Sequence, residues 1–258
     1  MCKKQIMKSP LNPSIHFRCF TELKKLLVPK SKICSFFLYD ANIELNLCRY
    51  EHFVTSITNI GCIYEFWNLA KKDPKHLSNV VKVYLDLLDE FNVETIRQEW
   101  FSQNSSEYRS AYFYIFQKIS NLGYASSGKL SLSNLSNLDI ITLKNFKSDN
   151  FSPLFSTSDD PIKFYDELGA MDYFLLPVGN YSLNLFEYGK NKGPEMYTFN
   201  HKEIHARVKD LDKKCILLYK NHPALFNLYK SFNIKMVDKY GRLSGDKESC
   251  EDLIITNF

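Results

Sequence analysis

The 258-residue sequence lacks the short motifs that identify several large classes of enzyme. It has no complete Gly-x-x-x-x-Gly-Lys-Ser/Thr loop, no Gly-x-Ser-x-Gly turn and no His-Glu-x-x-His pair, so nucleotide hydrolysis, α/β-hydrolase chemistry and zinc-dependent proteolysis have no support. His201 and His205 lie one helical turn apart, but the residues between them differ from the zinc motif and are typical of a surface helix. The spacing of serine, histidine and aspartate indicates no catalytic triad.

Long apolar runs and paired cysteines are also missing. No segment reaches the roughly 20 apolar residues that a membrane helix needs, and the N-terminus has no signal-peptide core. The seven cysteines contain no Cys-x-x-Cys pair, which favours free thiols over disulfides or a zinc site. With 45% hydrophobic residues, 24% charged residues and a net charge of +4, the composition is typical of a globular domain, and we expect a soluble, cytoplasmic protein.

The strongest positive signal is a buried strand at residues 173–176 that runs into a loop. Its apolar residues end at Pro177 and Gly179, as in a central parallel strand whose carboxyl end opens into a crevice. Ligands of open α/β sheets bind in that crevice. No carboxylate, histidine, cysteine or lysine occurs between Tyr173 and Glu187, so the predicted ligand position has few groups for catalysis.

Upstream of this strand, the pattern of apolar residues predicts alternating strands and helices. Residues 33–39 are expected to form a strand that ends at Asp40 and Asn42, where the acid either holds a ribose hydroxyl or caps the following helix. We expect helical structure over 52–101 and a helix over 108–119 whose aromatic residues lie in the core, then a turn at 126–129, a strand at 140–143 and a short helix at 162–168.

The C-terminal third alternates most regularly. After a polar loop at 183–197, Asn200 is expected to cap a helix that continues to Leu211, and Pro223 to begin the next helix. Strands are predicted at 215–219, 234–239 and 253–257. This order implies an α/β fold with parallel crossovers closed by a final hairpin.

Two C-terminal segments resemble the Dam-type adenine-specific DNA methyltransferases. They are the run Cys-Ile-Leu-Leu-Tyr-Lys-Asn-His-Pro-Ala-Leu-Phe-Asn-Leu-Tyr-Lys-Ser-Phe-Asn-Ile at 215–234 and the ending Glu-Asp-Leu-Ile-Ile-Thr-Asn-Phe at 251–258. Residues 9–12 and 197–200 are similar to shorter family segments, and residues 109–129 to the helix and DNA-contacting hairpin of the recognition region. The resemblance implies a Rossmann-like methyltransferase fold with a mostly parallel sheet and a C-terminal β-hairpin (residues 1–50 and 138–258), interrupted by a helical DNA-recognition insertion (residues 51–137).

The sequence departs from this family at both of its functional motifs. Where the family has Asp-Pro-Pro-Tyr, whose carboxylate and carbonyl bind the adenine amine while the tyrosine stacks on the base, this chain has Pro177, Val178, Gly179, Asn180 and Tyr181. No glycine occurs between Asn12 and Asp40, where the family has a glycine-rich loop for S-adenosylmethionine. That interval also looks too short for a complete strand, loop and crossover, so we expect a truncated cofactor pocket in which Asp40 and Asn42 are relics of the cofactor site.

The resemblance and its departures together predict a catalytically degenerate homologue that binds no cofactor. It would bind double-stranded DNA and form a heterodimer with an active methyltransferase subunit, for example in a restriction-modification system. The expected phosphate contacts, chosen for charge and loop position, are Arg109, Lys118, Ser127, Lys129, Lys220, Arg242 and Lys247. Two alternatives stay open: an active S-adenosylmethionine-dependent enzyme that uses Asn180 and Tyr181, and an assembly factor or inhibitor that does not contact nucleic acid.

Overall fold

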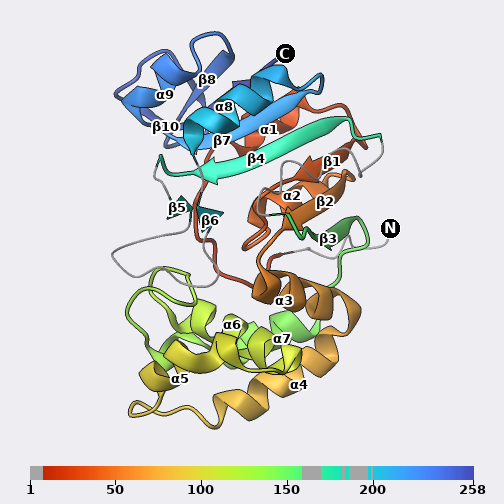
Figure 1. Ribbon diagram of the computed structural model, residues 1–258, viewed down its shortest axis with the longest axis vertical. Helices are drawn as coiled ribbons and strands as arrows, with labels where there is room; N and C mark the ends of the chain where they lie inside the picture. Colours follow the sequence, from red (N-terminus) through yellow and green to blue (C-terminus); the bar gives the residue numbers. More distant parts are fainter. Residues whose placement is uncertain (1–7, 159–169, 182–183, 186–196, 199) are drawn as a thin grey trace.

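The computed structural model describes residues 8–158, 170–181, 184–185, 197–198 and 200–258. It is a mixed α/β structure around an eight-stranded sheet with strand order β3-β2-β1-β4-β7-β10-β8-β9 (Figure 1). The mostly parallel sheet predicted from the sequence is confirmed: β1 (Lys32–Ser35) pairs in parallel with β2 (Phe53–Thr58) and β4 (Tyr173–Gly179), β2 with β3 (Phe151–Phe155), and β4 with β7 (Cys215–Lys220).

The far end of the sheet is antiparallel. β10 (Cys250–Thr256) lies between β7 and β8 (Asn233–Asp238) and runs antiparallel to both, and β9 (Leu243–Ser244) pairs with β8 at the edge. The predicted closing by an antiparallel last strand is therefore confirmed. β10 is buried along most of its length, as expected for an apolar strand inserted between two others.

The order of the strands fixes where a ligand would bind. From β1 the chain continues to β2 and β3 on one side, whereas β4 and β7 extend the sheet on the other side of β1. The strand order therefore reverses between β1 and β4. In open α/β sheets the crevice outside the carboxyl ends of the strands at such a switch point is the usual ligand site.

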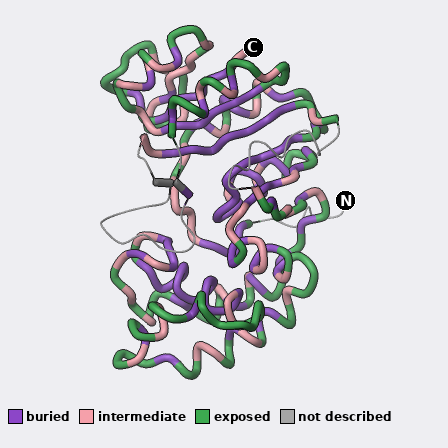
Figure 2. Tube along the Cα trace, viewed as in Figure 1, coloured by how far each residue is buried: buried purple, intermediate pink, exposed green. Residues whose placement is uncertain are grey.

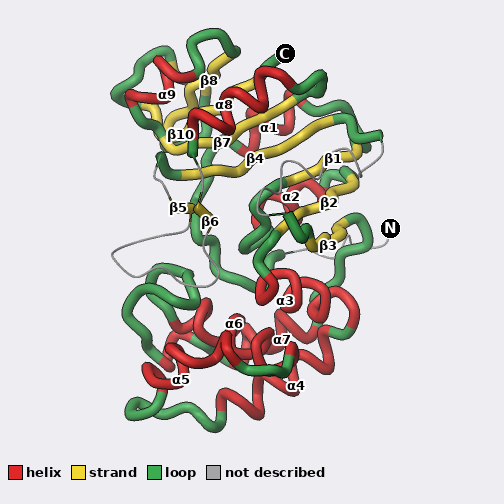
Figure 3. The backbone as a smooth tube through the Cα atoms, in the orientation of Figure 1, coloured by secondary structure: helices red, strands yellow, loops and turns green. Residues whose placement is uncertain are grey.

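The helices divide into two groups (Figure 1, Figure 3). Four belong to the part of the chain that carries the sheet: α1 (Phe20–Leu26), α2 (Asn42–Arg49), α8 (His201–Asp210) and α9 (Pro223–Leu228). The others gather at the end of the molecule away from β8: α3 (Gly61–Lys72), α4 (Pro74–Leu85), α5 (Val93–Glu99), α6 (Ser106–Ile119) and α7 (Asn137–Lys144), with short 3-10 turns at Trp100–Ser102 and Leu132–Asn134. A small ladder, β5 (Asn184–Leu185) with β6 (Tyr197–Thr198), is separate from the sheet.

The aromatic helix α6 forms the centre of the second group. All residues from 110 to 119 are buried, so the predicted core role of its aromatic residues is confirmed (Figure 2). α3 joins this group to the sheet through Trp67, whose ring contacts Phe146 and Phe151 and whose Nε1 donates to the carbonyl of Tyr39 at 2.6 Å. The helices are thus packed on the carboxyl side of β1.

Two predicted elements differ from the structure, and two predicted segments cannot be compared with it. Residues 53–58 form β2 in the sheet, although the sequence analysis placed them in a helical insertion, because Thr55, Ser56 and Thr58 interrupt the apolar run that marks a buried strand. Residues 140–143, predicted as a strand, lie in α7, and the strand of this region is β3. The predicted helix at 162–168 and most of the 183–197 loop lie outside the described residues. Among the residues that are described, no helix is long and apolar enough to cross a membrane.

Candidate ligand crevice

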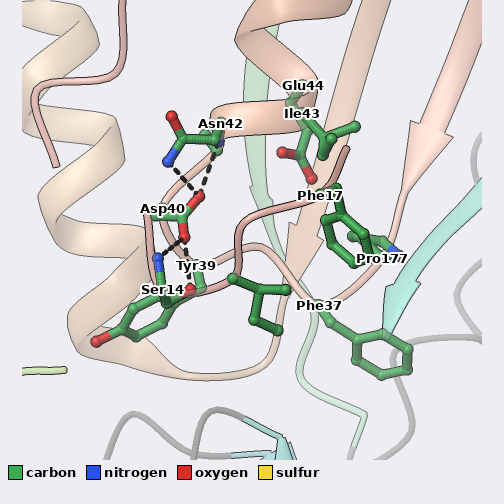
Figure 4. A pocket seen from close by; sticks show the side chains of 11 residues that line it. Ser14, Phe17, Phe37, Tyr39, Asp40, Asn42, Ile43, Glu44 and Pro177 are labelled. Carbon is green, nitrogen blue, oxygen red and sulfur yellow. Dashed lines mark hydrogen bonds between the residues drawn. The ribbon is translucent and has the colours of Figure 1, made fainter. Parts of the chain in front are cut away.

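A pocket lies at the switch point, outside the carboxyl ends of β1 and β4 (Figure 4). Its volume is about 30 Å³, the share of one water molecule in the liquid. Pockets that hold a drug-sized ligand have about 300–1,000 Å³. The pocket is lined by the N-terminal segment, the loop after β1, the first turn of α2 and the end of β4: Ser14, Ile15, Phe17, Phe37, Tyr39, Asp40, Ala41, Asn42, Ile43, Glu44 and Pro177.

The loop after β1 has the backbone of a glycine-rich loop without the glycines. Phe37 and Ala41 have φ angles of 61° and 52°, in the left-handed region that costs a non-glycine residue about 1–2 kcal/mol. Glycine in such a loop lets a ligand approach the backbone closely. Here Phe37 is buried and its side chain occupies part of the crevice, next to the ring of Tyr197 at a centroid distance of 5.3 Å.

The position of this loop corrects one prediction. The interval before Asp40 was expected to be too short for a complete strand and loop, but Asp40 follows β1, the strand at the switch point, and α1 precedes that strand. The interval before Asp40 is therefore long enough for α1, β1 and the complete loop. The crevice is small because side chains fill it, and no element is missing from it.

Asp40 binds the chain itself. Its Oδ1 accepts from the backbone N–H and the side-chain amide of Asn42 at 2.9 and 2.8 Å, and its Oδ2 accepts from the backbone N–H and hydroxyl of Ser14 at 2.6 and 2.5 Å (Figure 4). The contact with the N–H of Asn42, the first residue of α2, agrees with the predicted role of Asp40 at the start of that helix. The same carboxylate holds the N-terminal segment across the crevice.

That segment, residues 9–19, is fixed along its length. Ser9 Oγ donates to the Asp40 carbonyl, and Asn12 exchanges hydrogen bonds with Gln117 of α6. Ile15 packs onto Gly179 at the end of β4 so closely that a Cβ on Gly179, where φ is +78°, would lie 2.1 Å from its Cδ1. The buried carboxylate of Asp252 accepts from the backbone N–H groups of Arg18 and Cys19. The N-terminal segment is therefore an integral part of the crevice wall.

Two polar groups in or beside the crevice are buried with partners from the protein. The Tyr197 hydroxyl lies 3.0 Å from the Leu38 carbonyl and also hydrogen-bonds Thr58 Oγ1, which joins the loop after β1 to the end of β2. Burial raises the pKa of Tyr197 well above its usual range. Glu44 accepts from Ser35 Oγ at 2.7 Å, and burial of its carboxyl raises its pKa to about 7. Both groups are therefore held by hydrogen bonds within the protein.

The carboxyl end of β4 leads into the segment that the resemblance likens to the family's catalytic motif. Pro177 lines the pocket, Val178 is buried, and a bulge in the pairing with β7 falls between Pro177 and Gly179. Asn180 and Tyr181 follow the strand. The Tyr181 ring stacks on two imidazoles, with centroid distances of 4.5 Å to His201 and 4.5 Å to His222 and interplanar angles of 28° and 25°. This ring is therefore already in stacked contact with protein rings.

These observations test whether the crevice fits S-adenosylmethionine. The cavity has about a tenth of the smallest volume expected for such a ligand, and Phe37 and Ala41 stand where backbone approach needs glycine. Asp40 is occupied by Ser14 and Asn42. The residues present do not fit the cofactor.

Three of the predicted DNA-contacting residues bind groups within the protein. Arg109 donates from Nε to Glu65 at 2.8 Å, which raises the pKa of the guanidinium, and Lys118 is buried against Asp139 at 2.6 Å and Asn12 at 2.7 Å. Lys220 pairs with Asp252 at 2.6 Å and donates to the carbonyl of His16. These three side chains hold segments of the protein together. A fourth predicted contact, Ser127, is buried, and its hydroxyl has no hydrogen-bond partner among the described residues.

Lys129, Arg242 and Lys247 are exposed. Lys129 follows α6 in the helical group, whereas Arg242 and Lys247 lie around β9, at the opposite end of the molecule in Figure 1. Lys247 Nζ lies 4.5 Å from the centre of the Phe226 ring. The guanidinium of Arg242 lies 5.9 Å from the centre of the Tyr240 ring. The structure does not bring the three cations together on one surface.

Residues 123–129 contain the spacing Gly-x-x-x-x-Gly-Lys, but in a different structural setting from a phosphate-binding loop. A phosphate-binding loop follows a strand, whereas this segment follows helix α6. The position after the lysine, which in such a loop is a serine or threonine that binds magnesium, is Leu130 in this chain. Around Gly128, a Cβ would lie 2.6 Å from Ser120 Oγ and from Asn121 Oδ1, so protein groups occupy the inside of the turn. In the part of the chain that the structure describes, no cluster of three or more His, Cys, Asp or Glu could hold a metal ion, and the six cysteines there are free and buried.

Comparison with known proteins gives little beyond the fold. No protein-family model matches the chain, and no curated protein matches it. Among solved structures, the chain is similar to one described as a fibrillarin/Nop5p complex, with 9% identity over 93% of this chain and 78% of that chain, and a TM-score of 0.36. Similarity at this level carries no information about activity.

Sequence reasoning missed the residues that fill the crevice, chiefly Ile15, Phe17, Phe37 and Tyr197. The absence of glycine before Asp40 was the one local signal that bears on this region of the crevice. It did not indicate which side chains fill it, because they come from segments far apart in the sequence.

Proposed function

We propose that this protein is a methyltransferase-like protein that does not bind S-adenosylmethionine and acts as a non-catalytic partner of an active methyltransferase. The observation that carries this proposal is the crevice at the switch point, which has room for about one water molecule. If S-adenosylmethionine cannot enter the crevice, its methyl group cannot be positioned next to an acceptor.

The fold supports the class of protein. The sheet has the parallel order of a doubly wound fold, and one antiparallel strand, β10, is inserted beside the last parallel strands. This arrangement agrees with the methyltransferase fold that the resemblance of residues 215–234 and 251–258 implies. Those two segments form β7, α9 and β10, which build this end of the sheet.

The site supports the loss of activity. An adenine methyltransferase of the resembling family stacks the flipped base on the aromatic residue after β4. Tyr181 occupies the corresponding position, and its ring stacks on His201 and His222. Stacking of a base on this ring would compete with these contacts. We propose further that DNA binding by this protein uses the exposed cations Lys129, Arg242 and Lys247.

A methyl-transfer assay tests the proposal against the hypothesis of an active enzyme. The purified chain is incubated with S-adenosylmethionine labelled in its methyl group and unmethylated duplex DNA. We expect no label in the DNA, with the wild type and with Asn180→Ala alike. Transfer by the wild type that is lost in Asn180→Ala would establish the enzyme and overturn the proposal.

A further inference from the structure

An exposed, acidic and apolar tip lies between α4 and α5, at the end of the molecule away from the sheet (Figure 1). This acidic tip comprises residues 86–92, Asp-Leu-Leu-Asp-Glu-Phe-Asn. Phe91 is 95% exposed and Leu87 is 58% exposed. An exposed phenyl ring of this kind is unfavourable in water unless a partner covers it.

The tip is rigidly built, although its large apolar side chains point to solvent. Asp89 Oδ1 accepts from the backbone N–H groups of Phe91 and Asn92, both at 2.8 Å, while Asn92 Oδ1 accepts from the N–H of Asp89 at 2.9 Å. Asn92 Nδ2 donates to the carbonyl of Leu87 at 2.9 Å. A partner that binds Phe91 would therefore lose little entropy in ordering the loop.

Buried neighbours anchor the same loop from inside. Leu88 and Val93 are buried, and they alternate with the exposed Leu87 and Phe91. Val83, 60% exposed, lies four residues before Leu87 and so on the same side of the helix and its last turn. Leu87 thus continues the exposed side of α4 that includes Val83, and Phe91 follows in the loop, while Leu88 and Val93 hold the loop from inside.

The charge around these residues identifies the chemistry of the partner. Asp86, Asp89 and Glu90 are exposed beside Leu87 and Phe91, in a chain whose net charge is +4. A nucleic acid backbone would be repelled by these carboxylates. A protein surface with an apolar pocket and a rim of lysine and arginine is complementary to both features.

We propose that the acidic tip is a docking site for a partner protein, with Phe91 as the anchor that enters an apolar pocket with a basic rim. Aromatic anchors of this kind carry much of the free energy of many protein interfaces. This docking site rests on the proposed function in one respect, the expectation of a partner protein. It does not depend on whether the chain binds the methyl donor, so an experiment can refute the docking site without refuting the loss of donor binding, and the reverse.

The test places a photo-crosslinking phenylalanine analogue at position 91 of the full chain in cells of its source, with the same analogue at position 240 as the control. Tyr240 is also an exposed aromatic residue, at 70%, but lies near β9. We expect a crosslinked protein that appears from position 91 and not from position 240. That protein is then purified and titrated with the chain.

Support requires that the purified protein binds the wild-type chain, that Phe91→Ser weakens binding by about 10-fold or more, and that Tyr240→Ser leaves it within about 2-fold. Replacing Asp86 and Glu90 by Asn and Gln should also reduce the dependence of binding on salt. No product from position 91, equal products from both positions, a crosslink to a second copy of this chain, or binding unchanged in Phe91→Ser would each overturn the proposal. Circular dichroism of Phe91→Ser confirms that the variant is folded.

Discussion

Glu44 provides a test of how dry and closed the crevice is. Its side chain is 3% exposed and lines the pocket, and its Oε1 accepts a single hydrogen bond from Ser35. A buried carboxyl is harder to ionise because the charge loses its hydration, and the nearby Asp40 adds a weaker effect in the same direction. Burial therefore raises the pKa of Glu44 from 4.5 to about 7.

The size of the effect follows from linkage. Because the pKa is higher in the folded state, the folded protein binds more protons between pH 4.5 and pH 7. The contribution to stability is complete below pH 4.5 and is lost as the pH rises through 7. At about 1.4 kcal/mol for each pKa unit, the loss from this one group amounts to about 3 kcal/mol between pH 4.5 and pH 8.

Glu44→Gln removes the charge and keeps an oxygen that can accept from Ser35. We expect the variant to be more stable than the wild type by up to about 3 kcal/mol at pH 8 and to differ little from it at pH 4.5. Urea unfolding, followed by the fluorescence of the buried Trp67 and Trp100, measures both values. The exposed Glu90→Gln is the matched control and should leave the pH dependence unchanged. An identical pH dependence in Glu44→Gln and the wild type would refute a dry, closed crevice.

Three further predictions concern the elements around the crevice and the proposed DNA contacts. Asp252→Ala should cost about 1–3 kcal/mol in the free energy of unfolding, because it leaves the backbone N–H groups of Arg18 and Cys19 without their acceptor and removes the carboxylate partner of the partly buried Lys220; urea unfolding checks the value. Gly179→Ala should cost at least about 1 kcal/mol, since φ is +78° and the new methyl group meets Ile15, and an unchanged unfolding midpoint would contradict this. If DNA binds, Arg242→Glu with Lys247→Glu should lower the salt slope of binding by about 2, whereas Lys118→Gln should leave the slope unchanged, as read by fluorescence anisotropy with duplex DNA.

The elements that could be predicted are those with strong local signals. Pro223 begins α9, and the Asn200 side chain caps α8 by accepting from Lys202. These residues set the boundaries of helices through their own φ angle or hydrogen bond, so the sequence nearby determines them. The strands between them are continuous apolar runs, which is the pattern of buried strands.

Elements with weak or conflicting local signals were predicted wrongly. Residues 140–143 are four consecutive residues compatible with a strand, but Ser136 and Asp139 form a capping box that starts a helix. The pattern Ser-x-x-Asp was present in the sequence and outweighs the short apolar run. The strand β2 could not be recognised from its polar residues, because its neighbours β1 and β3 provide the pairing that stabilises it.

The closing of the crevice depends on contacts between distant segments. Ile15 meets Gly179, and Tyr197 meets Phe37, across more than a hundred residues of chain. The positive φ angles of Phe37 and Ala41 are held by the surrounding structure against the preference of those residues. Local sequence patterns contain no information about such contacts. The side chains that fill the crevice could therefore not be identified from the sequence.

A calorimetric titration of the purified full chain with S-adenosylmethionine, with and without unmethylated duplex DNA, tests the central claim most directly. The filled crevice predicts no saturable heat at donor concentrations up to the millimolar range in either experiment. Saturable binding with a micromolar Kd would contradict the account, because it would require Ile15, Phe17 and Phe37 to leave the crevice.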